Sequence, residues 1–115
     1  MIVAGNLNLF MTRGCTFEVL QLQMQDANGN PVVITNFTCS AQVRTFPGDE
    51  LVLDLNPSVT DGPNGIVTIP EVSDDLTPAL TLGNHRWDLL LESDTGVRVR
   101  MLYGDFDISD PITNP

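Results

Sequence analysis

Residues Asp26 to Pro31, with the sequence DANGNP, have side chains that could bind a metal ion. Oxygen-bearing side chains stand at alternate positions, as they do at the start of an EF-hand calcium loop. That loop requires a glycine at its sixth position and a glutamate at its twelfth, but Pro31 and Phe37 stand there. Asn28 and Gly29 instead tolerate the positive φ angles of a tight turn. We therefore predict a turn here and no metal site.

The other residues that could do chemistry are scattered along the chain. Asp105 and Asp107 are predicted to share the exposed face of the last strand, with a weak calcium site as the less favoured alternative. His85 is the only histidine, and we interpret its GNHR segment as an exposed turn. A catalytic triad requires an oriented base and a zinc site requires four ligands. We therefore predict no enzymatic activity, no metal and no cofactor.

The two cysteines could form one disulfide. Cys39, however, alternates with apolar residues, which is typical of a small buried side chain. The first residues have neither a basic start nor a long apolar centre, so we expect no secretory signal. Because disulfides persist mainly in oxidising compartments, we predict that Cys15 and Cys39 are free thiols.

The charge of the chain argues against two classes of partner. Its 115 residues include fifteen acids and five basic residues, all arginine, for a formal net charge of −10. Such a charge repels phosphate backbones and anionic lipid surfaces, so we predict no nucleic acid and no membrane partner. Apolar runs are far shorter than the roughly 20 residues of a membrane helix, and we expect a soluble protein.

Short alternating runs separated by Gly, Pro, Asn and Asp about every 8–12 residues predict an all-β sandwich or barrel of seven or eight strands. Residues 56–65 are expected to form a loop, and residues 73–85 contain the one helical turn, capped by Ser73. The expected strands are residues 6–11, 16–25, 31–34, 36–45, 51–55, 66–72, 86–93 and 97–109. The predicted core is Ala41, Val43, Val67, Ile69, Trp87, Leu89, Phe106 and Ile108.

The chain is predicted to form a single domain over residues 1–115, with a polar tail at 110–115. Residues 1–13 have two interpretations. They can form an apolar arm that adds a strand to a neighbouring protein, or residues 6–11 can be the first strand of the sandwich itself. The candidate interface residues of the arm are Ile2, Val3, Leu7, Leu9 and Phe10.

Arg98 and Arg100 alternate on one face of the last predicted strand. They have two interpretations of equal weight. The two side chains can form ion pairs with Glu92 or Asp94 across the hairpin, or they can lie at a subunit contact, where arginine is enriched. We therefore include both in the candidate interface.

The motifs of the chain have a recognisable order. They are Gly14 with TFEVLQLQ, then DANGNP, VVIT, AQVR, LVLDL, NGIVTI, DDLTPAL, WDLLLES and MLYGDFDIS. In this order they resemble the small Ig-like β-sandwich domain of bacteriophage virion proteins, of the type at the N-terminus of baseplate upper proteins. The resemblance covers Gly14 to Ser109, although Cys15 stands where that pattern usually has a polar residue.

The resemblance implies an Ig-like antiparallel β-sandwich without catalytic residues. It implies a structural protein of a phage particle, made in the host cytoplasm, present in many copies and bound to other virion proteins. A tail, baseplate or fibre-attachment component is the first expectation, and a capsid decoration protein is the alternative. A carbohydrate-binding module is less favoured, because the chain has few aromatic residues besides Trp87 and Tyr103.

Overall fold

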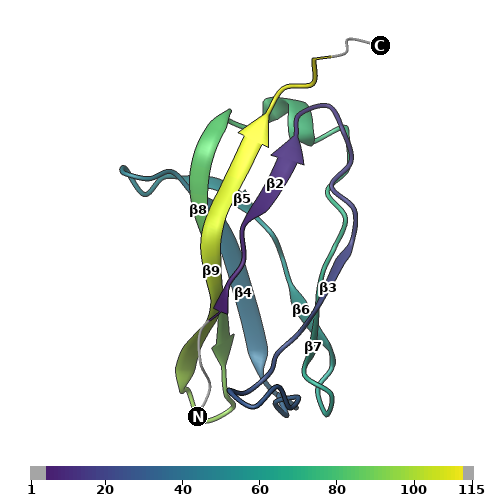
Figure 1. The fold of residues 1–115 in the computed structure, drawn as a ribbon, viewed down its shortest axis with the longest axis vertical. Coiled ribbons are helices and arrows are strands. Elements are labelled where there is room, and N and C mark those ends of the chain that lie inside the picture. The colour runs from purple at the N-terminus through teal and green to yellow at the C-terminus, as the bar shows by residue number, and fades with distance from the viewer. Residues whose placement is uncertain (1–4, 113–115) are drawn as a thin grey trace.

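The computed structural model describes residues 5–112, which form two β-sheets packed face to face (Figure 1). The larger sheet contains β1 (Gly5–Asn6), β2 (Leu9–Thr12), β4 (Thr38–Arg44), β5 (Leu51–Asp54), β8 (Gly83–Glu92) and β9 (Arg98–Ser109). The smaller sheet contains β3 (Leu20–Gln23), β6 (Ser58–Asp61) and β7 (Ile66–Ile69). The predicted Ig-like sandwich is confirmed, with nine strands within the described residues rather than seven or eight.

The strand order is that of an Ig domain. In the smaller sheet β7 lies between β3 and β6, and in the larger sheet the order is β1, β9, β8, β4, β5. An Ig domain places its strands B, E and D in one sheet and C, F and G in the other. Here β3, β7 and β6 take the first three places and β4, β8 and β9 the others. The central strands β8 and β9 form the predicted hairpin, closed by the turn between Ser93 and Val97.

The core lies between the two sheets, where the alternation placed it. The eight predicted core residues, Ala41, Val43, Val67, Ile69, Trp87, Leu89, Phe106 and Ile108, are all buried. They are joined there by residues from loops and from shorter strands, including Met24, Ile34 and Leu55. Each core strand therefore sends every second side chain inward, so its other side chains form an outer face.

The first strand pairs in parallel with the last one. Both β1 and β2 bond to β9, with Gly5 opposite Leu102 and Leu9 opposite Phe106. The pairing departs from the expected purely antiparallel sheet. It also places residues 5–12 in the sandwich's own sheet, the second of the two interpretations of this segment.

Trp87 fixes the junction between β1 and β2. Its indole Nε1 donates a 2.8 Å hydrogen bond to the carbonyl oxygen of Leu7. Trp87 lies opposite Gly104 in the β8–β9 ladder, and a Cβ at Gly104 would collide with that same carbonyl. The absence of a side chain at residue 104 thus allows the first strand to approach the hairpin, and Asn8 accepts a 3.0 Å hydrogen bond from the Asp105 amide.

Two segments differ from their prediction. Residues 31–34 are not a strand, because only Pro31 forms a bridge, to Gln25, while Ile34 turns into the core and Val33 is exposed. The expected loop at 56–65 contains β6, which pairs with β7. Both errors arise because local composition does not reveal whether a neighbouring strand supplies backbone partners.

The predicted helical turn is a short 3₁₀ helix, Thr77–Ala79. Leu76 rather than Ser73 is its N-cap residue, and no side chain caps it. Ser73 instead closes the preceding turn, since its hydroxyl oxygen accepts a hydrogen bond from the Asp75 amide at 3.2 Å. The described residues include no helix of membrane-spanning length and hydrophobicity.

The DANGNP segment is a turn, as predicted. The Asp26 carboxylate oxygen Oδ1 accepts hydrogen bonds from the amides of Asn28 at 2.9 Å and Asn30 at 3.0 Å. Gly29 has a φ of 82°, which glycine adopts without strain. The hydrogen bonds from Asn30 and Asn28 lower the pKa of Asp26 below its ordinary value. Its carboxylate therefore stabilises backbone amides of the turn.

Replacement of Trp87 by alanine tests the core. Deleting a buried aromatic side chain leaves a cavity and removes the hydrogen bond to Leu7, so Trp87→Ala should lower the free energy of unfolding by about 3–5 kcal/mol. Chemical denaturation would measure the change. Leu90→Ala, on the outer face of the same strand, is the control and should cost much less. A Trp87→Ala protein as stable as the parent would contradict the strand register.

The Asp26 turn should make stability depend on pH. The folded-state pKa of Asp26 is lowered, so the charged carboxylate stabilises the fold above the unfolded-state pKa, and this contribution is lost as pH falls through the folded-state pKa. Asp26→Asn removes the charge. The melting temperature of the parent should exceed that of Asp26→Asn at neutral pH, and the difference should shrink toward about pH 3.

The control is Asp94→Asn, because Asp94 is an exposed carboxylate in another turn and makes no side-chain hydrogen bond or ion pair within residues 5–112. It should leave the pH profile of the melting temperature unchanged. A constant difference between the parent and Asp26→Asn across this pH range would show that the charge has no part in the turn.

Candidate functional site

The outer face of the larger sheet gathers most of the positive charge of the protein. Four of the five arginines lie on it: Arg44, Arg86, Arg98 and Arg100. The register places five acids beside them, Asp54, Asp88, Glu92, Asp105 and Asp107. The loop residue Asp49 adds a sixth acid at this face, so the remainder of the molecule carries one arginine and nine of the fifteen acids. The face thus has a small net negative charge, and the rest of the surface is strongly negative.

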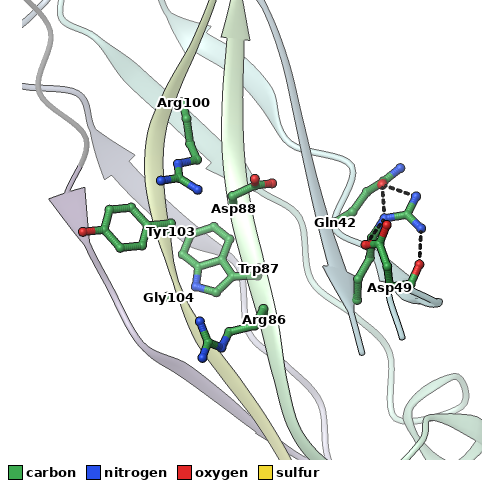
Figure 2. A pocket seen from close by; sticks show the side chains of 9 residues that line it. Gln42, Asp49, Arg86, Trp87, Asp88, Arg100, Tyr103 and Gly104 are labelled. Atoms are coloured by element: carbon green, nitrogen blue, oxygen red, sulfur yellow. Dashed lines mark hydrogen bonds and ion pairs between the residues drawn. The ribbon is translucent and has the colours of Figure 1, made fainter. Parts of the chain in front are cut away.

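A shallow hollow of about 360 Å³ lies in this face, across β4, β8 and β9 (Figure 2). The outward side chains stand in cross-strand rows, of which the two at the hollow are Arg44–Arg86–Asp105 and Gln42–Asp88–Tyr103. Arg100 borders the hollow farther along β9, and the loop residue Asp49 closes its other side. We call this feature the outer-face hollow.

Three of the four arginines on the face have partners within the chain. Arg86 Nε lies 3.1 Å from the carboxylate of Asp105. Arg98 Nε lies 3.4 Å from the carboxylate of Glu92, so the structure contains one of the cross-hairpin ion pairs of the first interpretation. Arg44 donates to Gln42 Oε1 at 2.8 and 3.1 Å, and its Nε lies 4.0 Å from the carboxylate of Asp49. Of these arginines, Arg44 and Arg86 line the outer-face hollow, while Arg98 lies outside it.

Two aromatic rings on the face stack against arginines. The guanidinium of Arg86 lies 4.4 Å from the ring centre of Phe46, and that of Arg100 lies 4.6 Å from the ring centre of Tyr103. Phe46 belongs to the loop between β4 and β5, which stands out to one side of the sandwich (Figure 1), and its side chain is 64% exposed. Arginine and aromatic side chains together are the residue types enriched in protein interfaces.

The predicted arm residues are divided by the structure. Leu7 and Leu9 pack partly against the core of the sandwich, while Phe10 points outward and is 77% exposed. Ile2 and Val3 lie outside the described residues. Phe10 borders a second, more apolar hollow between β2 and the segment that leads into β3. The candidate interface residues therefore do not form one patch: Leu7 and Leu9 face inward, and Phe10 lies in the row of Asp107, at the opposite end of β9 from Arg98 and Arg100.

The first residue of the predicted polar tail, Asp110, is held by an ion pair with Arg13. Arg13 Nε and Nη2 donate to the two carboxylate oxygens of Asp110 at 2.7 and 2.9 Å. This hydrogen bonding lowers the pKa of Asp110. The paired side chains hold the end of β2 to the end of β9, where the polar tail leaves the sheet.

The prediction that His85 lies in an exposed turn is wrong. His85 is in β8 with only 4% of its surface exposed, and its Nε2 lies 2.8 Å from the carbonyl oxygen of Thr81. The strand begins at Gly83 because β9 continues to pair with it as far as Ile108. The buried imidazole thus bonds to backbone and faces the core rather than a cleft.

The other candidate chemical groups are separated. Cys15 is exposed and Cys39 is half-buried, and both are free thiols. Burial raises the pKa of the Cys39 thiol, which disfavours the reactive thiolate. Asp105 is engaged by Arg86, and His, Cys, Asp and Glu side chains within residues 5–112 form no cluster of three or more that could hold a metal ion. The outer-face hollow is therefore the candidate functional site.

Sequence reasoning found Arg98 and Arg100 but missed Arg44, Arg86, Asp88 and Phe46. The signal was present in part, because Arg44 ends one predicted strand and Arg86 begins another. Their approach depends on β4 pairing with β8, which places Arg44 directly opposite Arg86. The local sequence pattern of a strand does not predict which other strand pairs with it.

Comparisons with known proteins support the fold and no family. No protein-family model matches the chain, and no curated protein matches it. Among solved structures it is similar to CopC from Methylosinus trichosporium OB3b, with a TM-score of 0.52 and 13% identity over 94% of this chain and 89% of that one.

A family 123 glycoside hydrolase from Clostridium perfringens matches with a TM-score of 0.36 and 11% identity. The match covers 95% of this chain but only 24% of the hydrolase, so the chain spans about a quarter of that protein. Identities this low concern backbone architecture only. What the first similarity shows for this chain is a β-sandwich fold.

Proposed function

We propose that this chain is a non-catalytic structural module of a bacteriophage particle, placed in the tail or baseplate. It binds neighbouring virion proteins through the outer face of its larger sheet. The observation that carries the binding role is the gathering of four arginines and two stacked aromatic rings on that face. The virion placement rests on the resemblance of the motif order between Gly14 and Ser109 to phage Ig-like domains.

The arrangement of the outer face suits a protein partner better than a reaction. Its arginines are held by ion pairs and ring stacking, so they lose little side-chain entropy when a partner binds. The outer-face hollow is shallow and crossed by paired charges, and its lining includes neither histidine nor cysteine. An attachment surface of this kind derives specificity from the pattern of its charges.

The placement is tested on purified phage particles that carry this gene. Mass spectrometry of the particles should detect the chain in many copies, and a density map should locate its sandwich in the tail or baseplate. Density on the capsid shell would favour the decoration protein over the tail component. Absence of the chain from purified particles would contradict the virion role altogether.

The binding face is tested by two variants that each add one negative charge, one on the outer face of the larger sheet and one on the smaller sheet. Phe46→Glu replaces the exposed ring that stacks on Arg86 by a carboxylate. It should reduce the occupancy of the chain in particles by about tenfold or more. Gln21→Glu adds the same charge to an exposed position of β3 in the smaller sheet and should leave occupancy unchanged. Both variants should melt near the parent temperature. Equal occupancy of the two variants would move the attachment surface elsewhere.

A further inference from the structure

Two charged groups at the outer-face hollow have no partner within residues 5–112. Arg44, Arg86 and Arg98 each face a carboxylate of the chain, but the guanidinium of Arg100 makes no ion pair and no side-chain hydrogen bond. The carboxylate of Asp88 likewise makes neither. The hollow therefore contains one unpaired positive and one unpaired negative group.

The unpaired arginine is held in place by its neighbours. Arg100 is exposed on β9, and its guanidinium lies 4.6 Å from the centre of the Tyr103 ring. A guanidinium stacked on an aromatic face keeps its N–H groups directed sideways for bidentate contact with a carboxylate. Arg100 thus presents an oriented donor at the edge of the hollow (Figure 2).

The unpaired carboxylate lies in the next row of the sheet. Asp88 is half-buried on β8 between Gln42 of β4 and Tyr103 of β9. Arg100 is aligned with Leu90, and the β-bulge between Leu89 and Leu90 separates it from Asp88 along the ladder. The two side chains reach the same hollow from neighbouring strands without pairing with each other (Figure 2).

We propose that the outer-face hollow receives a protein segment that presents a carboxylate to Arg100 and a cationic side chain to Asp88. This inference deepens the proposed function, because it rests on the outer face being the attachment surface. A segment with both charges is favoured over a purely acidic one, which the −10 net charge and Asp88 would repel. It is favoured over a purely basic one because such a segment would leave Arg100 facing a second positive charge.

The chemistry is tested with the whole protein and three peptide probes. The probes are alanine-based helical peptides that carry a Glu–Lys pair four residues apart, two glutamates, or two lysines, since residues at that spacing share a helix face. The readout is the ¹H–¹⁵N NMR signal of the Arg100 side-chain Nε and of the Asp88 and Tyr103 amides. We expect saturable shifts with the Glu–Lys peptide, at least about threefold tighter than with the other two.

Matched variants separate the hollow from the rest of the molecule. Arg100→Gln and Asp88→Asn should each abolish the preference for the Glu–Lys peptide. Arg13→Gln and Asp94→Asn make the same charge changes away from the outer face and should retain it. Neither hollow variant removes an ion pair of the chain, so melting temperatures should stay near the parent value. No shift with any probe, or equal shifts with all three, would overturn the inference.

Whether each variant raises or lowers the occupancy of the chain in phage particles gives a second test. A partner with both charges predicts that Arg100→Gln and Asp88→Asn each lower occupancy in particles, relative to Arg13→Gln and Asp94→Asn. Higher occupancy of Asp88→Asn would indicate an acidic partner, and higher occupancy of Arg100→Gln a basic one; either would overturn the inference. Parental occupancy of both variants would also overturn it, while the presence of the chain in particles would still support the proposed function.

Discussion

The hydrogen bond from the Trp87 indole to the Leu7 carbonyl oxygen joins the first strand of the chain to its central hairpin. It forms where β1 and β2 meet, beside Gly104, whose missing side chain lets the two segments approach. Without this junction β9 would be an unpaired edge, and its backbone would be open to other chains. The junction also fixes the backbone from which Tyr103 and Asp105 reach the outer face. The geometry of the candidate site therefore depends on a residue buried beneath it.

Much of the fold follows from alternation alone. The clean period of two in residues 37–43 and 87–91 predicts β4 and β8 and their inward residues, because a side chain buried between two sheets must be apolar at every second position. β6 could not be predicted this way. Its four residues stand between Pro57 and Gly62, and the partner that makes them a strand is β7. Residues 31–34 show the reverse case, an apolar run for which the fold supplies only one bridge.

The candidate site was less accessible to sequence reasoning than the core. Arg98 and Glu92 can be matched because one short turn separates them, whereas Arg44 and Arg86 meet only through a pairing between distant segments. Irregularities in the ladders add to the difficulty. Bulges at Val43/Arg44 and Leu89/Leu90 shift the register by one residue and decide which outward side chains become neighbours. Beyond the second bulge Arg100 is aligned with Leu90, which offers it no charged partner on β8.

The uneven distribution of arginines gives the molecule a permanent electric dipole. Its less negative end lies at the outer face of the larger sheet, because nine acids and one arginine occupy the rest of the structure. In the field of a negatively charged scaffold, the net charge would repel the molecule while the dipole turned that face toward the surface. The molecule would then associate slowly with the scaffold but with its outer face already turned toward it. Added salt would accelerate the association by screening the repulsion over a Debye length of about 8 Å. Orientation before contact is thus a property of the whole sandwich rather than of any single side chain.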